Sequence, residues 1–384
     1  MQIKEQILAV FKQQYGTPAL VVRAPGRINL IGEHTDYNHG FVTPAAIDKA
    51  MYFCFSANEE LIINLRAVNF DRRASIFLDD SLALRQSWED YFLAVLDALR
   101  ERGLKPTSGL NVVFGGDIPS GGGLSSSAAL CSGFIFGLNT LFGWSLTRLD
   151  MAFVAQRAEH IIGTMCGIMD MFASLHGKAN HVICLDCRDL SYSYFPLNLG
   201  DYELVLINTK VKHSLAESAY NDRRHDCETA LATLQKYQLG VQTLRDVNEK
   251  MVEANHDKLT QNQYKRVRFV VQEEQRVRNA TAALQAHDLP TVGRCMFEAH
   301  AGLSQMYEVS CPELDLLVAL AKTKSGVLGA RMMGGGFGGC TLNVVHKDAT
   351  AIVLEELSAA YEREIGWKPE PIFVRIEDGV GVVN

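Results

Sequence analysis

The stretch Gly115-Gly116-Asp117-Ile118-Pro119-Ser120-Gly121-Gly122-Gly123-Leu124-Ser125-Ser126-Ser127 decides the fold of this chain. Three successive glycines interrupt any regular element and let backbone amides approach a ligand closely. The apolar run that follows, residues 128–138, predicts a mostly buried helix. A glycine turn that feeds a helix N-terminus gathers unpaired N–H groups in a positive potential. The stretch therefore predicts an anion site with phosphate as its ligand, against the alternative of a Gly/Ser-rich surface loop.

The flanking segments predict a mixture of sheets and helices. Apolar runs predict strands at 19–24, 41–43, 51–56, 61–65, 74–78, 110–114, 181–185, 204–208, 327–332, 340–346 and 372–376. Amphipathic patterns predict helices at 1–15, 88–102, 147–162, 213–235, 263–286, 291–307, 312–323 and 348–365. The polar interval 240–262 is expected to hold a loop, and charged runs such as 272–276 are expected to be solvated helix faces.

Composition restricts the class of protein. The 384 residues are 47% hydrophobic and 21% charged, which is typical of a soluble globular protein with room for two domains. A net charge of −7 argues against nucleic acid as a partner. The nine cysteines, an odd number, predict a reduced environment and a packing role for the Cys184–Cys187 pair. We find neither a signal peptide nor a membrane span, and we expect a cytoplasmic location.

A second unusual stretch, residues 25–40, crowds charged and polar side chains into a short glycine-containing segment. Such a set of donors and acceptors suits a polyhydroxylated ligand, since each hydroxyl group both donates and accepts. A solvated loop with an Asx-turn at Asp36 or Asn38 is an equally good reading of the composition.

Two carboxylates further along the chain are candidates for chemistry. Glu159 lies near the C-terminal end of a helix that a capping box at Thr147–Asp150 announces. The helix dipole disfavours a carboxylate there, which suggests a cationic partner or a metal, although composition alone favours a solvent-facing side chain. Asp170 begins an apolar short helix and is either its cap or a general base.

A third glycine cluster, residues 334–339, separates two predicted strands and contains GxGxxG. A strand follows it where a Rossmann fingerprint needs a helix, so it predicts a tight hairpin or packing turn. The chain also lacks GxxxxGK[ST] and the HRD and DFG motifs, which excludes P-loop enzymes and protein kinases.

These motifs carry a family resemblance. Residues 119–128 resemble the ATP loop of the superfamily of galactokinase, homoserine kinase, mevalonate kinase and phosphomevalonate kinase. The sequence GRINLIGEHTDYN, residues 26–38, resembles the galactokinase signature, and residues 332–339 resemble the third superfamily motif. Residues 166–170 also fit galactokinases.

The resemblance implies a role for each matching position. Backbone amides and hydroxyls of the ATP loop would bind the phosphates, namely those of Gly121, Gly122, Gly123, Leu124, Ser125, Ser126 and Ser127. Ser127 and Glu159 would hold Mg²⁺. Sugar hydroxyls would bond to residues of the signature and of the later chain, namely Glu33, His34, Thr35, Asp36, Asp170 and Tyr220. Asp170 would accept the proton of the C1 hydroxyl, while Arg27 would keep Asp170 ionised and stabilise charge on the phosphoryl group.

The resemblance further implies an α+β fold in two lobes with the active site in the cleft between them. We expect residues 1–185 to form the N-terminal lobe and 186–384 the C-terminal lobe, with the last strand able to return to the first lobe. The implied reaction is ATP-dependent phosphorylation of α-D-galactose at C1, the first committed step of galactose catabolism, by a monomer. Two alternatives remain: a non-catalytic sugar and ATP sensor, and a kinase for another sugar such as N-acetylgalactosamine.

Overall fold

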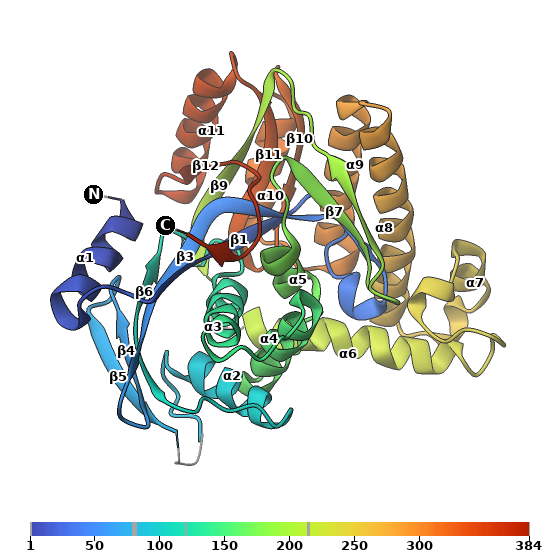
Figure 1. The fold of residues 1–384 in the computed structure, drawn as a ribbon. Coiled ribbons are helices and arrows are strands. Elements are labelled where there is room, and N and C mark those ends of the chain that lie inside the picture. Colours follow the sequence, from blue (N-terminus) through green and yellow to red (C-terminus); the bar gives the residue numbers. More distant parts are fainter. Residues whose placement is uncertain (1, 79–82, 120, 213–215, 384) are drawn as a thin grey trace.

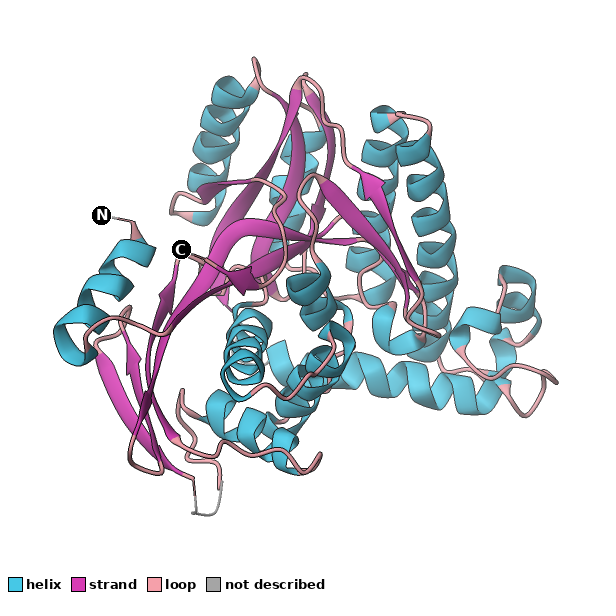
Figure 2. Cartoon of the chain, viewed as in Figure 1, coloured by secondary structure: helices cyan, strands magenta, loops and turns pink. Residues whose placement is uncertain are grey.

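A computed structural model describes residues 2–78, 83–119, 121–212 and 216–383, and its architecture is α+β with three sheets (Figures 1 and 2). Ser120 of the glycine stretch, and residues 213–215 of the helix expected at 213–235, lie outside the described residues. The helices are α1 (Ile3–Tyr15), α2 (Asp90–Arg100), α3 (Ser126–Phe142), α4 (Arg148–Ile162), α5 (Met169–His176), α6 (Ala216–Leu234), α7 (Glu249–Ala254), α8 (Gln261–Gln285), α9 (Leu289–Gly302), α10 (Pro312–Lys322) and α11 (Thr350–Ile365). Short helical segments are η1 (Asp36–Asn38), η2 (Leu244–Asp246), η3 (His256–Lys258) and the π-helical η4 (Leu303–Tyr307).

The first lobe is built on a six-stranded sheet. Its order is β13 (Gly381–Val382), β1 (Leu20–Asn29), β3 (Pro44–Asn58), β6 (Gly109–Gly116), β4 (Ile62–Ala67) and β5 (Arg72–Phe77). Apolar side chains of this sheet and of α2, α3, α4 and α5 form one core. Ile7 and Phe11 of α1 pack against Cys54 and Val113 of the sheet in a separate cluster. The β1–β3 register shifts between Pro25 and Arg27, where the strand enters the site.

The second lobe is built on a four-stranded antiparallel sheet. Its order is β10 (Val327–Met332), β11 (Gly338–His346), β9 (Tyr202–Lys212) and β12 (Glu370–Val374). Both faces of β9 are buried: Leu204 and Leu206 belong to one apolar cluster, while Val205 and Ile207 belong to another. Alternate side chains of a strand point to opposite faces, so this continuous apolar run indicates a strand covered on both sides.

A three-stranded sheet of β2 (Phe41–Val42), β7 (His181–Asp186) and β8 (Tyr192–Pro196) completes the architecture. It packs against α8. The capping box at Thr147–Asp150 is confirmed. The interval 240–262 contains η2, α7 and η3, joined by short non-helical stretches. One expectation is wrong: the charged run 272–276 is not a solvated face, because Glu273 and Glu274 in it are buried.

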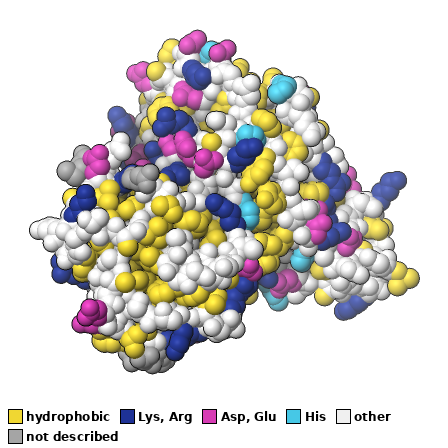
Figure 3. Space-filling view, viewed as in Figure 1, with side chains coloured by type: hydrophobic (Ala, Val, Ile, Leu, Met, Phe, Trp, Pro, Cys, Tyr) yellow, Lys and Arg dark blue, Asp and Glu magenta, His cyan; other side chains and the backbone are white. Residues whose placement is uncertain are grey.

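Surface and cysteine chemistry agree with the composition. Lys/Arg and Asp/Glu side chains are interspersed on the face shown in Figure 3. None of the described helices combines the length and apolarity that crossing a membrane would require. All nine cysteines carry free thiols, including Cys184 and Cys187.

Candidate active site

The acidic and basic candidates Asp170 and Arg27 form a direct ion pair. Arg27, on β1, donates from Nε to Asp170 Oδ1 at 2.7 Å, and Asp170 lies in the first turn of α5. The other Asp170 oxygen, Oδ2, accepts from the Ser125 hydroxyl at 2.5 Å. Burial alone would lower the pKa of Arg27, but the charges of Asp170 and Glu33 outweigh it, so the pKa is raised. Arg27 therefore stays positively charged beside the carboxylate.

The glycine-rich loop runs into the N-terminus of α3, as the sequence predicts. Ser125 directly precedes the helix with a φ of +56°, and Arg27 Nη1 donates to the carbonyl of Gly123 at 2.5 Å. The loop also touches the third glycine cluster. A Cβ at Gly334 would lie 3.0 Å from the Gly123 carbonyl oxygen, so the two backbones pack without room for side chains.

Glu33 links the signature of the first lobe to the second lobe. It is 1% exposed, and its Oε1 accepts from Arg331 Nη2 at 2.5 Å and from the Gly334 amide at 2.8 Å. Arg331 is fully buried on β10. Sequence reasoning missed Arg331, whose isolated position in a strand carries no motif signal.

Asp36, His34 and Tyr220 line one narrow cavity with Arg27 and Asp170. The cavity measures about 40 Å³, and Glu33 also lines it. Burial, followed by the nearby Asp170 charge, raises the pKa of Asp36 to about 7. Burial lowers the pKa of His34 to about 3 and raises that of Tyr220 well above its usual value. Both rings are therefore neutral hydrogen-bonding groups.

Thr35, also expected at the sugar, has its hydroxyl inside the loop. Its Oγ1 lies 2.9 Å from the Gly32 carbonyl oxygen and 2.7 Å from that of Phe41, and the residue is fully buried. The Thr35 side chain thus ties the two ends of this loop together.

An aromatic group surrounds His34. Its Nδ1 is 2.8 Å from the Tyr37 hydroxyl, which is 2.8 Å from the Tyr307 hydroxyl of η4. The His34 and Tyr220 rings lie 5.3 Å apart. These contacts fix the orientation of the imidazole in the cavity wall.

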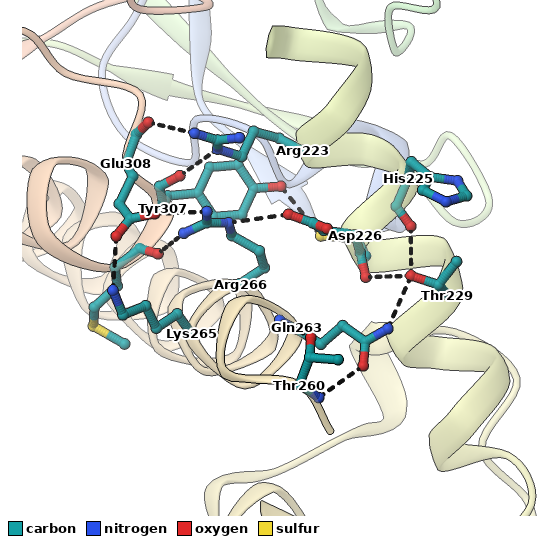
Figure 4. Close-up of polar contacts among 12 residues, drawn as sticks. Arg223, His225, Asp226, Thr229, Thr260, Gln263, Lys265, Arg266, Tyr307 and Glu308 are labelled. Carbon is teal, nitrogen blue, oxygen red and sulfur yellow. Dashed lines mark hydrogen bonds and ion pairs between the residues drawn. The ribbon is translucent and has the colours of Figure 1, made fainter. Parts of the chain in front are cut away.

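A polar network holds α6, which carries Tyr220, against η4 and α8 (Figure 4). Arg223 of α6 donates to the carbonyl oxygens of Tyr307 and Glu308 at 2.8 and 2.9 Å. Arg266 of α8 lies 2.7 Å from Glu308 and 3.5 Å from Asp226 of α6. The network anchors the helix from which Tyr220 reaches the cavity.

A second, more apolar cavity of about 380 Å³ adjoins Ser126 and Ser127. Its wall includes the aromatic side chains of Phe70, Trp88 and Tyr91. Sequence reasoning missed this cavity, because Phe70, Trp88 and Tyr91 belong to no motif.

Glu159 of α4 is 4% exposed, so the solvent-facing reading of this residue is wrong. Burial and the Glu159 charge raise the pKa of the Cys131 thiol, which places the carboxylate near α3. Cys131 lies four residues after Ser127, one helical turn along the same face. The Nε2 atom of His160, the next residue, lies 2.9 Å from the Cys166 carbonyl oxygen.

Comparison with known proteins agrees with this geometry. The "Galactokinase galactose-binding signature" matches residues 9–57, and the "GHMP kinases N terminal domain" and "GHMP kinases C terminal" match residues 90–178 and 280–363. The chain is 38% identical to a galactokinase of Roseiflexus sp., covering 97% of this chain and 95% of the relative. It is 39% identical to a galactokinase of Clostridium acetobutylicum, covering 100% and 98%.

A solved structure, Lactococcus lactis galactokinase complexed with galactose, has a TM-score of 0.95 to this chain at 32% identity. The match covers 99% of both chains. Two-lobed α+β architecture, the three motifs in order and full-length similarity to curated relatives lead to one conclusion: the chain belongs to the galactokinase family.

Proposed function

We propose that this enzyme transfers the γ-phosphoryl group of ATP to the C1 hydroxyl of α-D-galactose, giving α-D-galactose 1-phosphate and ADP. The observation that carries the proposal is the fixed Asp170 carboxylate, held by Arg27 on one oxygen and by Ser125 on the other. This carboxylate joins the cavity of the sugar signature to the glycine-rich loop.

Asp170 and Arg27 would act on the acceptor, the C1 hydroxyl of galactose. Asp170 accepts the proton of the C1 hydroxyl as the bond from that oxygen to the γ-phosphorus forms. The bond from the γ-phosphorus to the bridging oxygen breaks, and ADP leaves with the electron pair. Arg27 pairs with the Asp170 carboxylate and stabilises the negative charge on the transferring group, the main requirement of phosphoryl transfer.

The glycine-rich loop and the N-terminus of α3 would bind the nucleotide. Amides of Gly121–Ser127 at the start of α3 suit the phosphates, because a helix N-terminus offers unpaired N–H donors in a positive potential. The adjoining cavity beside Trp88 suits a purine ring, which stacks on aromatic side chains.

Mg²⁺ fits the donors at this end of α3. A hydroxyl from Ser127 and the buried carboxylate of Glu159 are hard oxygen ligands, and Mg²⁺ typically takes one or two carboxylates together with substrate phosphates. Ser127 and Glu159 would hold the ion, which when bound would neutralise charge on the phosphates.

Residues 33–36 and α6 would contact the sugar. Glu33, with Oε1 fixed by Arg331, and Asp36 offer carboxyl oxygens, while the neutral rings of His34 and Tyr220 add further donors and acceptors. Thr35 supports the loop from behind, since its hydroxyl contacts the loop's own carbonyls.

A coupled ADP-release assay over a panel of hexoses, including galactose, glucose and N-acetylgalactosamine, tests the proposal. We expect turnover with galactose above all others. Turnover only with another sugar would overturn the specificity, and sugar binding without any ADP release would favour a sensor.

Asp170→Asn keeps the size of the side chain but removes its basicity. We expect this variant to lose turnover while it still binds ATP, as measured by calorimetry. Near-normal turnover would remove Asp170 from the reaction.

A further inference from the structure

The sugar-side residues Glu33, His34 and Asp36 all lie on one short segment, residues 32–41, which we term the signature loop. Its ends, Gly32 and Phe41, are joined by the Thr35 hydroxyl. The direction in which the loop's side chains point therefore depends on what fixes these two ends.

Two consecutive glutamates of α8 meet the two ends of the signature loop. Glu273 Oε1 accepts from the Gly32 amide at 2.9 Å, and Glu274 Oε1 accepts from the Phe41 amide at 2.9 Å. Consecutive helical side chains point about 100° apart, so one turn of α8 reaches two separate points of the loop.

Both carboxylates are buried, at 0% and 5% exposure, and each has an arginine partner. Arg276 Nε lies 2.6 Å from Glu273 Oε2, and Arg245 Nε lies 3.3 Å from Glu274 Oε2. The Arg245 guanidinium also lies over the Phe41 ring, 3.5 Å from its centroid. Burying adjacent carboxylates is unfavourable, and apolar residues would serve simple packing better. Burial also raises the pKa of Glu274 to about 7.

The fit between α8 and the loop leaves no spare room. A Cβ at Gly40 would lie 1.9 Å from Glu274 Oε1 and 2.8 Å from Thr35 Cβ. Neither glutamate lines the cavity that contains Asp36 and Asp170. Their contacts with the signature loop run through its backbone.

We propose that Glu273 and Glu274 are positioning residues for sugar recognition, which fix both ends of the signature loop to α8 so that Glu33, His34 and Asp36 face the cavity. The assignment rests on the proposed function for its kinetic consequence, but the anchoring itself can be measured without turnover.

Kinetics of Glu273→Ala and Glu274→Ala test the consequence. Loss of a hydrogen bond to a charged acceptor should raise KM for galactose about 10-fold, while KM for ATP stays within about 2-fold. Glu274→Gln keeps a carbonyl oxygen for the Phe41 amide and should recover most of the lost galactose affinity. Gln275→Ala, at an exposed position of the same helix, is the matched control. Equal changes in both KM values, or no recovery with glutamine, would overturn the proposal.

Hydrogen–deuterium exchange gives a readout that is independent of activity. We expect faster exchange in the peptides covering residues 32–41 of the alanine variants, with the α3 peptides unchanged. Unchanged exchange there overturns the anchoring even if the enzyme phosphorylates galactose. Faster exchange in an enzyme that phosphorylates no hexose would instead retain the anchoring and remove the proposed function.

Gly40→Ala disturbs the same contact from the loop and leaves the sequence of α8 unchanged. This variant therefore tests the proposal even if the glutamate variants do not fold. We expect a raised KM for galactose and an unchanged KM for ATP. An unchanged KM for galactose would overturn the proposal, since the added Cβ cannot coexist with Glu274 in its observed place.

Discussion

Ser125 and Asp170 are joined by a hydrogen bond of 2.5 Å between the serine hydroxyl and Oδ2, the carboxylate oxygen opposite the one that Arg27 holds. The bond ties the glycine-rich loop to the proposed base. With both oxygens fixed, the carboxylate has one orientation relative to the start of α3.

Ser125→Ala removes this contact. We expect kcat for galactose phosphorylation to fall about 10- to 100-fold, because a hydrogen bond to a charged group contributes about 1.5–3 kcal/mol. Steady-state kinetics with both substrates measure the effect. Ser145→Ala is the matched control, since Ser145 is exposed and has a similar φ of +60°. An equal loss in both variants would mean that the backbone, not the hydroxyl, is responsible.

Asp36→Asn should change how stability depends on pH. The pKa of Asp36 is about 7 in the folded chain, against 3.8 as its ordinary value. Between these values the folded chain holds a proton that the unfolded chain releases, so this group makes stability fall as pH rises from about 4 to about 7. Asparagine stays neutral throughout. We therefore expect the variant to gain stability relative to the parent at pH 8 compared with pH 5.

Thermal unfolding midpoints at the two pH values, without sugar, measure this difference. Asp201→Asn, at an exposed position before β9, is the control. An equal pH-dependent gain in that variant would contradict the assignment to Asp36.

Trp88→Ala tests the apolar cavity beside Ser126 and Ser127. Stacking of a base on an aromatic ring contributes about 1–3 kcal/mol, so we expect KM for ATP to rise about 10-fold with KM for galactose unchanged. Trp144→Ala provides a comparison, because Trp144 stacks on Phe142 and does not line the cavity. A change in the KM for galactose alone would mean that the adenine ring of ATP does not bind in this cavity.

Glu159→Gln tests the metal role. The amide is a weaker ligand for a divalent cation than the carboxylate, so we expect the Mg²⁺ concentration for half-maximal rate to rise about 10-fold. A Mg²⁺ titration of the ADP-release rate gives the value, and Glu101→Gln, whose partner Arg157 lies on the surface, controls for charge. An unchanged titration would leave Glu159 without a metal role.

Local pattern was enough to predict most elements and the loop that enters α3. Glycines, alternating apolar runs and a capping box act over a few neighbouring residues, so they can be recognised in a single sequence. The short strands β8 and β13 were missed, because their pairing depends on neighbours that are distant in the sequence. The α+β fold and its family were accessible through the motifs.

The site was less predictable where burial reverses the usual meaning of a residue. Glu273 and Glu274 read as solvated, yet their partners Gly32 and Phe41 stand 241 and 233 positions earlier in the chain. Residue type alone gives no reason to assign different roles to Ser125, Ser126 and Ser127. Ser125 has a left-handed φ just before α3, and its hydroxyl donates to Asp170. Amino-acid composition does not distinguish this serine from its two neighbours.

The segment after β12 returns to the first lobe. The Gly379 amide donates to the Gly177 carbonyl at 2.9 Å, the Val380 amide donates to that of Ser174 at 2.8 Å, and β13 pairs with β1. During translation, β1 is synthesised long before the segment that pairs with it. During synthesis the part of the β1 edge that pairs with β13, at Val22 and Arg23, therefore lacks this partner until the second lobe has emerged.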